Sequence, residues 1–143
     1  MNDYRIITIE GELEPVDMKV LVDGMLSYHA SKGHPRKVDK YSILIKNDDD
    51  KLIGCVMVSF LWNGMQIGSL WVEESRRGQG LGQKLMEMAE AEGKKRGCEF
   101  AYTDTFTWQA PGFYEKLGYT IYGKLNDFPK GNELRYYRKD LKI

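Results

Sequence analysis

The chain of 143 residues lacks most features that mark a specialised class of protein. It contains only two cysteines, Cys55 and Cys98, and two histidines, which are too few for a disulfide framework or a convincing zinc site. No apolar run approaches the roughly 18 residues that a membrane span needs. No apolar segment follows the charged N-terminus as in a signal peptide. These absences predict a cytoplasmic protein with no metal and no membrane partner.

An excess of charge of either sign is also missing. Lysine and arginine together number 21, and aspartate and glutamate together also number 21. Nucleic-acid binding usually relies on a basic excess, so no nucleic acid is expected as a partner. With 42% hydrophobic and 29% charged residues, the composition is that of a globular protein, and the length suits a single domain over residues 1–143.

Strand and helix signals alternate along the chain. Segments rich in β-branched and aromatic residues predict strands over residues 4–9, 41–45, 52–62, 65–72, 99–104, 118–123 and 133–140. Pro15 suits the first position of a helix, and residues 27–40 predict a loop or a broken second helix. Asn63-Gly64 predicts a hairpin. The strand at 99–104 follows a helical crossover, so it should lie parallel to the strand before that helix.

The most informative stretch runs from Gln66 to Gly97. A predicted strand at 67–72 leads through a polar turn into the glycine-rich residues 77–82, and a helical pattern follows. Its expected apolar face consists of Leu81, Leu85, Met88 and Ala89, and Gly97 is expected to cap its end. Glycines let the backbone approach a ligand, and the unpaired N–H groups of a first helical turn favour an anion. The stretch therefore predicts a phosphate-binding turn.

The spacing of the glycines separates the known phosphate-binding motifs. The dinucleotide motif Gly-x-Gly-x-x-Gly does not fit, and the Lys-Ser or Lys-Thr ending of a P-loop is absent. A generic ATP-binding or NAD-binding domain is thereby disfavoured. The spacing present, Arg77-x-x-Gly80-x-Gly82, resembles the pyrophosphate loop of the GNAT family of N-acetyltransferases, which bind acetyl-CoA.

A second motif strengthens the resemblance. Ala110, then Phe113-Tyr114, then Gly118 followed by the aromatic Tyr119, is similar to the other signature of the GNAT family. Because both signatures occur in the right order, the chain is identified as a member of this family along its whole length. The resemblance implies the GNAT fold of the α/β class, with a mixed, mostly antiparallel sheet of six to seven strands flanked by about four helices.

The family resemblance also implies an activity, the direct transfer of the acetyl group of acetyl-CoA to a primary amine of a small molecule or peptide. A thiolate must leave when an amine attacks the thioester. Tyr114 would protonate that sulfur as the general acid. The alternative for Tyr114 is a buried tyrosine whose hydroxyl is satisfied within the protein.

Cofactor-binding residues follow from the same resemblance. The strand that ends at Leu70, Trp71 and Val72 would splay from its neighbour, so that its backbone pairs with the amide-bearing arm of CoA and offers a candidate oxyanion donor. The residues expected to cradle the pyrophosphate are Gly78, Gln79, Gly80, Leu81, Gly82 and Gln83. Arg77 fits a phosphate contact and a solvated surface charge equally well.

The general base is less well defined. Attack requires a neutral amine, whereas a free alkylamine is mostly protonated near pH 7. Glu73 at the end of the splayed strand is the first candidate and Asp104 is the second, ahead of His29 and His34. The alternative for each, which its setting in the sequence favours, is a turn, capping or surface residue. Thr107 stands where many family members carry an Asn that contacts CoA, and its hydroxyl can still donate one hydrogen bond.

A different class of function stays open beside the enzyme. A non-catalytic acyl-CoA-binding or sensing module would keep the glycine turn and dispense with the acid, and Tyr114 argues against it. The acceptor amine is not specified by the sequence: an antibiotic, a polyamine, an amino acid and a protein N-terminus all fit. A homodimer is possible, since relatives commonly form one.

Overall fold

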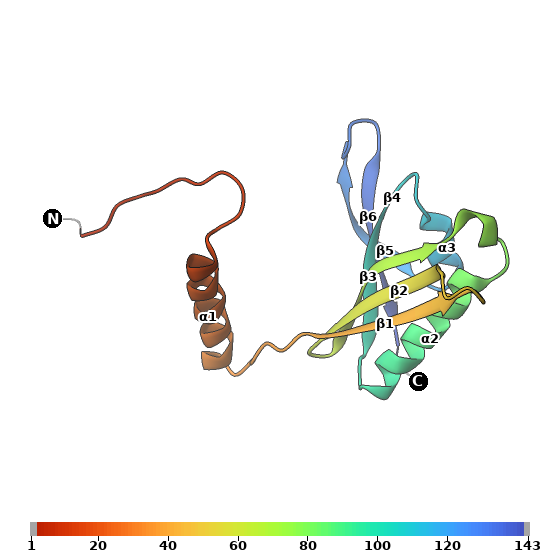
Figure 1. Cartoon of the computed structure of the whole chain (residues 1–143), viewed down its shortest axis with the longest axis horizontal. Helices are drawn as coiled ribbons and strands as arrows, with labels where there is room; N and C mark the ends of the chain where they lie inside the picture. The colour runs from red at the N-terminus through yellow and green to blue at the C-terminus, as the bar shows by residue number, and fades with distance from the viewer. Residues whose placement is uncertain (1–2, 142–143) are drawn as a thin grey trace. The chain divides into compact units, whose positions relative to one another are not determined.

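The computed structural model describes residues 3–141, which fall into an N-terminal unit up to Arg36 and a C-terminal unit from Lys37 (Figure 1). The single domain over residues 1–143 stays a prediction. The N-terminal unit contains one helix, α1 (Pro15–Ser31), which begins at the proline as predicted. No side chain of α1 is buried.

One prediction for the N-terminal unit is wrong. Residues 4–9 form no strand, and no backbone hydrogen bond within the described chain involves them. β-branched residues favour a strand only where a neighbouring strand and a half-buried face are present. Within the described part of their own unit, residues 4–9 have no strand beside them and are exposed. Of the two alternatives predicted for residues 27–40, the structure has the loop, which follows the end of α1 at Ser31 and contains Gly33 at a φ of 83°.

The C-terminal unit is built on one six-stranded sheet in the order β1-β2-β3-β4-β6-β5. Its strands are β1 (Asp39–Lys46), β2 (Leu52–Leu61), β3 (Gly64–Val72), β4 (Phe100–Phe106), β5 (Thr120–Asn126) and β6 (Glu133–Asp140). All neighbours are antiparallel except β3 and β4, which are parallel. The predicted mixed, mostly antiparallel α/β fold is therefore confirmed, with six strands and, among the described residues, three α-helices.

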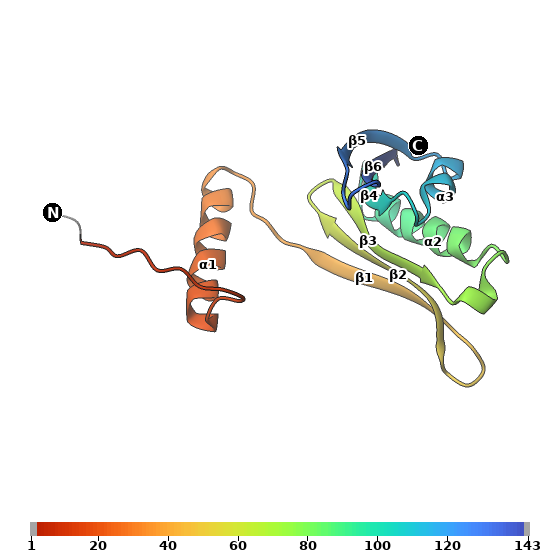
Figure 2. The same ribbon diagram turned by 90° about the horizontal axis from the view of Figure 1, so that it is seen from above.

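Helix α2 (Leu81–Lys95) makes the crossover that places β4 parallel to β3, and Figure 2 shows it along one face of the sheet. Its C-terminal cap is confirmed at Gly97, whose φ is 85°. The N–H of Gly97 donates to the carbonyl of Lys94 at 3.0 Å, and the N–H of Cys98 donates to that of Gly93 at 2.9 Å. This pair of bonds is the Schellman motif, which leaves the chain pointing into β4.

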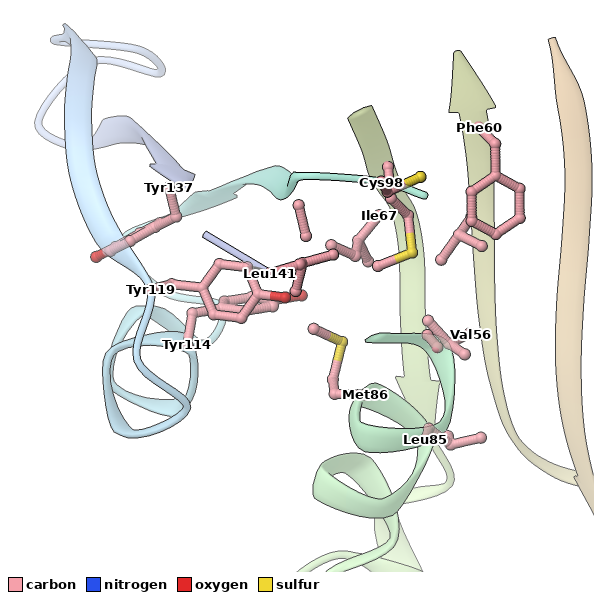
Figure 3. Close-up of a cluster of buried hydrophobic side chains, with 14 residues drawn as sticks. Val56, Phe60, Ile67, Leu85, Met86, Cys98, Tyr114, Tyr119, Tyr137 and Leu141 are labelled. Carbon is pink, nitrogen blue, oxygen red and sulfur yellow. The ribbon is translucent and has the colours of Figure 1, made fainter. Parts of the chain in front are cut away.

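Between β4 and β5 lies the short helix α3 (Pro111–Lys116), and a 3₁₀ turn, η1 (Glu74–Arg76), joins β3 to the glycine-rich turn. The main core fills the space between α2, α3 and the sheet (Figure 3). Its fully buried members include Val56, Met65, Leu85, Met86 and Tyr137. The core therefore lies on the face of the sheet that α2 and α3 cover.

The buried face of α2 differs from the predicted one. Leu85, Met86, Ala89 and Gly93 are buried, whereas the side chain of Met88 is 49% exposed, so its predicted place on the apolar face is wrong. Close packing explains the difference, because a Cβ on Gly93 would lie 3.1 Å from the Met65 sulfur. The helix is turned so that the small face of Gly93 meets the sheet.

The predicted hairpin joins β2 to β3, but its turn is displaced by one residue. Leu61 pairs with Gly64, so the two turn residues are Trp62 and Asn63, and Trp62 takes the positive φ of 50°. Gly64 belongs to β3, where a Cβ would lie 2.9 Å from the ring of Phe100. This glycine is therefore needed for close strand packing and is not available for the turn.

The orientation of α2 predicts unequal effects of two truncations on the same helix. Leu85→Ala removes a fully buried side chain and is expected to lower the free energy of unfolding by about 2–5 kcal/mol. Met88→Ala, the matched control, is expected to change it by less than about 0.5 kcal/mol. Urea denaturation measures both values, and equal losses would contradict this orientation of the helix.

Candidate active site

Strands β3 and β4 pair over a short distance and then diverge. Their parallel ladder covers only Gly64–Gln66 and Phe100–Tyr102. One residue further on, the hydroxyl of Thr103 donates to the carbonyl of Ile67 at 2.9 Å, so a side chain spans the gap that main-chain bonds no longer close. Beyond this point the facing edges of β3 and β4 have no ladder bonds to each other.

A cavity of about 240 Å³ occupies the divergence. Its lining residues are Ile67, Gly68, Ser69 and Leu70 from β3, Thr103, Asp104 and Thr105 from β4, and Gln109, Ala110 and Tyr114 from the segment after β4. Of the predicted site residues, the structure brings together Leu70, Asp104 and Tyr114 at this cavity. Trp71, Val72 and Glu73 follow Leu70 along the chain and are not among its lining residues.

Tyr114 is held rigidly at the base of this cavity. Its side chain is only 6% exposed, and its ring packs edge-on against Tyr119 and nearly parallel to Tyr137, with ring centroids 5.7 and 6.2 Å away (Figure 3). Burial raises the pKa of Tyr114, the hydrogen bond with Thr103 counteracts this, and the negative charge of Asp104 raises it again. The phenol is therefore neutral at ordinary pH and has a proton to donate.

Side-chain hydrogen bonds fix the loop before α3. Gln109 Oε1 accepts hydrogen bonds from the Phe106 N–H at 2.8 Å and from the Thr105 hydroxyl at 3.3 Å. The N–H of Ala110 in turn donates to the Thr105 hydroxyl at 3.3 Å. Because Ala110 directly precedes α3, these hydrogen bonds set where the helix begins and thus where Tyr114 lies.

Sequence reasoning missed three residues at this site: Thr103, Thr105 and Gln109. A signal for the threonines was present, since both alternate with Asp104 and share the face of β4 that carries the buried Ala101. A polar residue on an apolar face points to a specific hydrogen-bonding role. For Gln109 the sequence carries no comparable signal.

The glycine-rich turn has the backbone that the motif predicts. Gly78 and Gly80 have φ values of 79° and 78°, in the left-handed region, and Gly80 is the N-cap of α2. The first helical bond reaches back from the Lys84 N–H to the Gly80 carbonyl at 3.0 Å. The N–H groups of the residues between them, 81–83, therefore precede the intrahelical ladder and are suited to bind an anion.

Arg77 is tied to the strand that precedes this turn. Its Nε donates to the carbonyl of Val72 at 3.0 Å and closes the connection between β3 and α2. Gly82 brings the start of α2 against α3, because a Cβ there would lie 3.4 Å from the ring of Phe113. The turn and the tyrosine-bearing helix therefore pack against each other.

Glu73 and Thr107 are engaged away from the cavity. The carboxylate of Glu73 accepts a hydrogen bond from Ser75 at 3.0 Å and lies 3.3 Å from the ammonium of Lys51. Its pKa is lowered, first by the Ser75 bond and then by Lys51, which makes it a weaker base. The hydroxyl of Thr107 donates to the Asn132 side chain at 3.0 Å. Of the two carboxylates predicted as bases, only that of Asp104 belongs to a residue that lines the cavity.

Neither histidine named as a candidate base belongs to the C-terminal unit that holds the cavity, since His29 lies in α1 and His34 follows it. Among residues 3–141 there is no group of three or more His, Cys, Asp and Glu side chains that could hold a metal. No helix in the described chain has the length and apolar character to cross a membrane.

The C-terminal unit thus combines diverging parallel strands, a glycine turn at a helix start and a buried tyrosine. Comparison with known proteins identifies the family. Residues 15–119 match the Acetyltransferase (GNAT) family. The chain belongs to this family of acetyltransferases. The predicted family and the predicted acetyltransferase class are thereby confirmed.

Named relatives and a solved structure show the extent of the similarity. An acetyltransferase of Agrobacterium fabrum is 34% identical over 122 residues, covering 85% of this chain and 88% of that protein. Blasticidin-S acetyltransferase of Streptomyces morookaense is 32% identical over 97 residues, covering 67% of this chain and 71% of that protein. The crystal structure of an acetyltransferase from Bacillus cereus superposes with a TM-score of 0.82 at 29% identity, covering 93% of this chain and 97% of that one.

The two ends of α2 allow a matched test of the glycine turn. Gly80→Ala and Gly97→Ala each force a side chain into a left-handed backbone with no atom within 4 Å of the new Cβ. Both are expected to lower the free energy of unfolding by roughly 1–2 kcal/mol. Only Gly80→Ala is expected to raise the Kd for acetyl-CoA, by about tenfold or more. Calorimetric titration measures the affinities, and an equal change in Kd would contradict the assignment of the turn.

Proposed function

We propose that this acetyltransferase transfers the acetyl group directly from acetyl-CoA to a primary amine of a small molecule, with both substrates bound at once. The observation that carries the proposal is the cavity between β3 and β4, because a strand end with free backbone groups and the buried Tyr114 line the same space. An acyl donor that binds along this strand end brings its thioester within reach of that phenol.

In this proposal the cofactor follows the chain from β3 into α2. The backbone of Leu70, Trp71 and Val72 pairs with the amide-bearing arm of CoA, as a missing neighbouring strand would. Residues 78–83 bind the pyrophosphate through the free N–H groups of the first turn of α2. Arg77 acts mainly by holding the turn, since its Nε is bonded to Val72.

The chemistry assigned to the cavity is a single acyl transfer. The neutral amine attacks the thioester carbonyl, and a C–N bond forms as the carbonyl electrons move onto oxygen. The tetrahedral intermediate then collapses, the C–S bond breaks, and the thiolate takes the proton of Tyr114. An N–H of the strand end stabilises the oxyanion.

The amine must lose a proton, and Asp104 is our choice for the group that accepts it. It lines the cavity and its side chain is exposed to solvent, which gives the proton a route out. Glu73 is a poorer candidate because Ser75 and Lys51 hold its carboxylate elsewhere. Thr107 contributes to the cofactor site only if its hydroxyl leaves Asn132, so we give it no role.

A small-molecule acceptor is supported by the similarity to an enzyme named for blasticidin S. A peptide amine is the second candidate. A homodimer and a cytoplasmic location stay predictions. The alternative of a non-catalytic acyl-CoA sensor is set aside, because the chain belongs to a family of acetyltransferases.

The general-acid assignment predicts a specific defect in Tyr114→Phe. This variant keeps the ring between Tyr119 and Tyr137 and removes only the hydroxyl, so kcat is expected to fall about 10²-fold to 10⁴-fold while the Kd for acetyl-CoA is unchanged. Release of CoA thiol in the presence of a panel of primary amines measures kcat. Unchanged turnover would show that Tyr114 is not the acid.

A further inference from the structure

A group of tyrosines surrounds Asp104 on the face of the sheet opposite α2. Tyr102 and Asp104 share one face of β4, since the intervening Thr103 is on the core face. Asp104 lies directly across the ladder from Tyr136 on β6. The ring centroid of Tyr122 on β5 is 6.0 Å from that of Tyr136. We call Tyr102, Asp104, Tyr122 and Tyr136 the tyrosine–aspartate patch.

The patch adjoins the cavity through Asp104, which belongs to both. Its members also influence one another electrostatically. Burial raises the pKa of Tyr122 most, and Tyr102, Asp104 and Tyr136 raise it further, while Arg138 lowers it. A cation placed among these groups would therefore meet a carboxylate and the electron-rich faces of several rings.

The cations that the chain itself places nearby are already engaged. The guanidinium of Arg138 lies 4.1 Å from the ring of Phe100 and 3.4 Å from the carboxylate of Asp140. Lys124, on β5, lies 3.6 Å from the carboxylate of Glu133. None of the salt bridges formed within residues 3–141 includes Asp104. The negative charge of the patch is thus left for a ligand.

We propose that the tyrosine–aspartate patch binds a positively charged group of the acceptor other than the reacting amine. The preferred acceptor class is then a diamine or polyamine. This inference rests on the proposed function. The reacting nitrogen cannot be this cation, because it must be neutral when it attacks. A second ammonium on the same molecule remains charged throughout. It gains from the Asp104 carboxylate as the acceptor binds and from the rings also after Asp104 has taken the proton of the reacting nitrogen. Asp104 joins the two subsites, which fits an acceptor that spans them.

The test compares butylamine with putrescine, its diamine counterpart, at saturating acetyl-CoA. The wild-type protein is expected to show a kcat/KM for putrescine about threefold to thirtyfold higher than for butylamine. Tyr122→Leu is expected to remove this preference by raising the KM for putrescine, with butylamine turnover unchanged. Tyr122→Phe keeps the ring and is expected to keep the preference. Urea denaturation verifies that both variants are folded.

Calorimetric titration of the two amines into the CoA-bound protein separates the possible failures. Equal kcat/KM for both amines, or an equal loss for both in Tyr122→Leu, overturns the patch assignment and leaves the proposed function intact. Tyr122-dependent binding of putrescine without turnover supports the patch and overturns the proposed function. If neither amine is bound or turned over, the patch assignment and the proposed function are both overturned.

Discussion

The short parallel pairing of β3 with β4 is the constraint on which the rest of the site depends. The crossover through α2 forces these strands to run parallel, yet they pair over only three residues each. The hydroxyl of Thr103 then bridges to the Ile67 carbonyl and fixes the angle at which the strands separate. Without that divergence the backbone of residues 67–70 would be consumed by a ladder, and no cavity would form between the strands. The divergence also leaves the cavity that Tyr114 of α3 lines together with residues of β3 and β4.

A buried polar network supports the aromatic wall behind Tyr114. Glu90 on α2 is only 7% exposed, and it accepts hydrogen bonds from the hydroxyl of Tyr119 at 2.9 Å and the ammonium of Lys139 at 2.7 Å. Burial and the Glu90 carboxylate both raise the pKa of Tyr119, so its phenol stays a donor. Because the buried charge is paired and hydrogen-bonded, it fixes the ring of Tyr119, and that ring in turn packs against Tyr114. Helix α2 therefore carries the glycine turn at its N-terminus. Through Glu90 on its buried face it also supports the ring that packs against the proposed acid.

Much of the fold could be predicted from the sequence, because local signals specify it. The strands of the sheet, the α2 crossover and the Gly97 cap follow from periodicity and turn chemistry, whereas the motifs around Gly80 and Tyr114 were identified by their resemblance to a known family. The wrong predictions concern features that depend on contacts between residues distant in the chain. Residues 4–9 have strand composition but no strand beside them in the described part of the N-terminal unit, and the exposure of Met88 follows from how closely Gly93 approaches Met65. The choice between Glu73 and Asp104 as the base stays a prediction, although the fold adds that Ser75 and Lys51 hold the carboxylate of Glu73.

The central claim is that acetyl-CoA binds along the diverging end of β3 and the glycine turn. The most direct measurement is residue-resolved amide hydrogen exchange with and without acetyl-CoA. Slower exchange is expected in two segments, the strand end at residues 70–72 and the first turn of α2 at residues 81–83, because their N–H groups would then donate to the cofactor. Protection confined to other parts of the chain, with these two segments unchanged, would contradict the account.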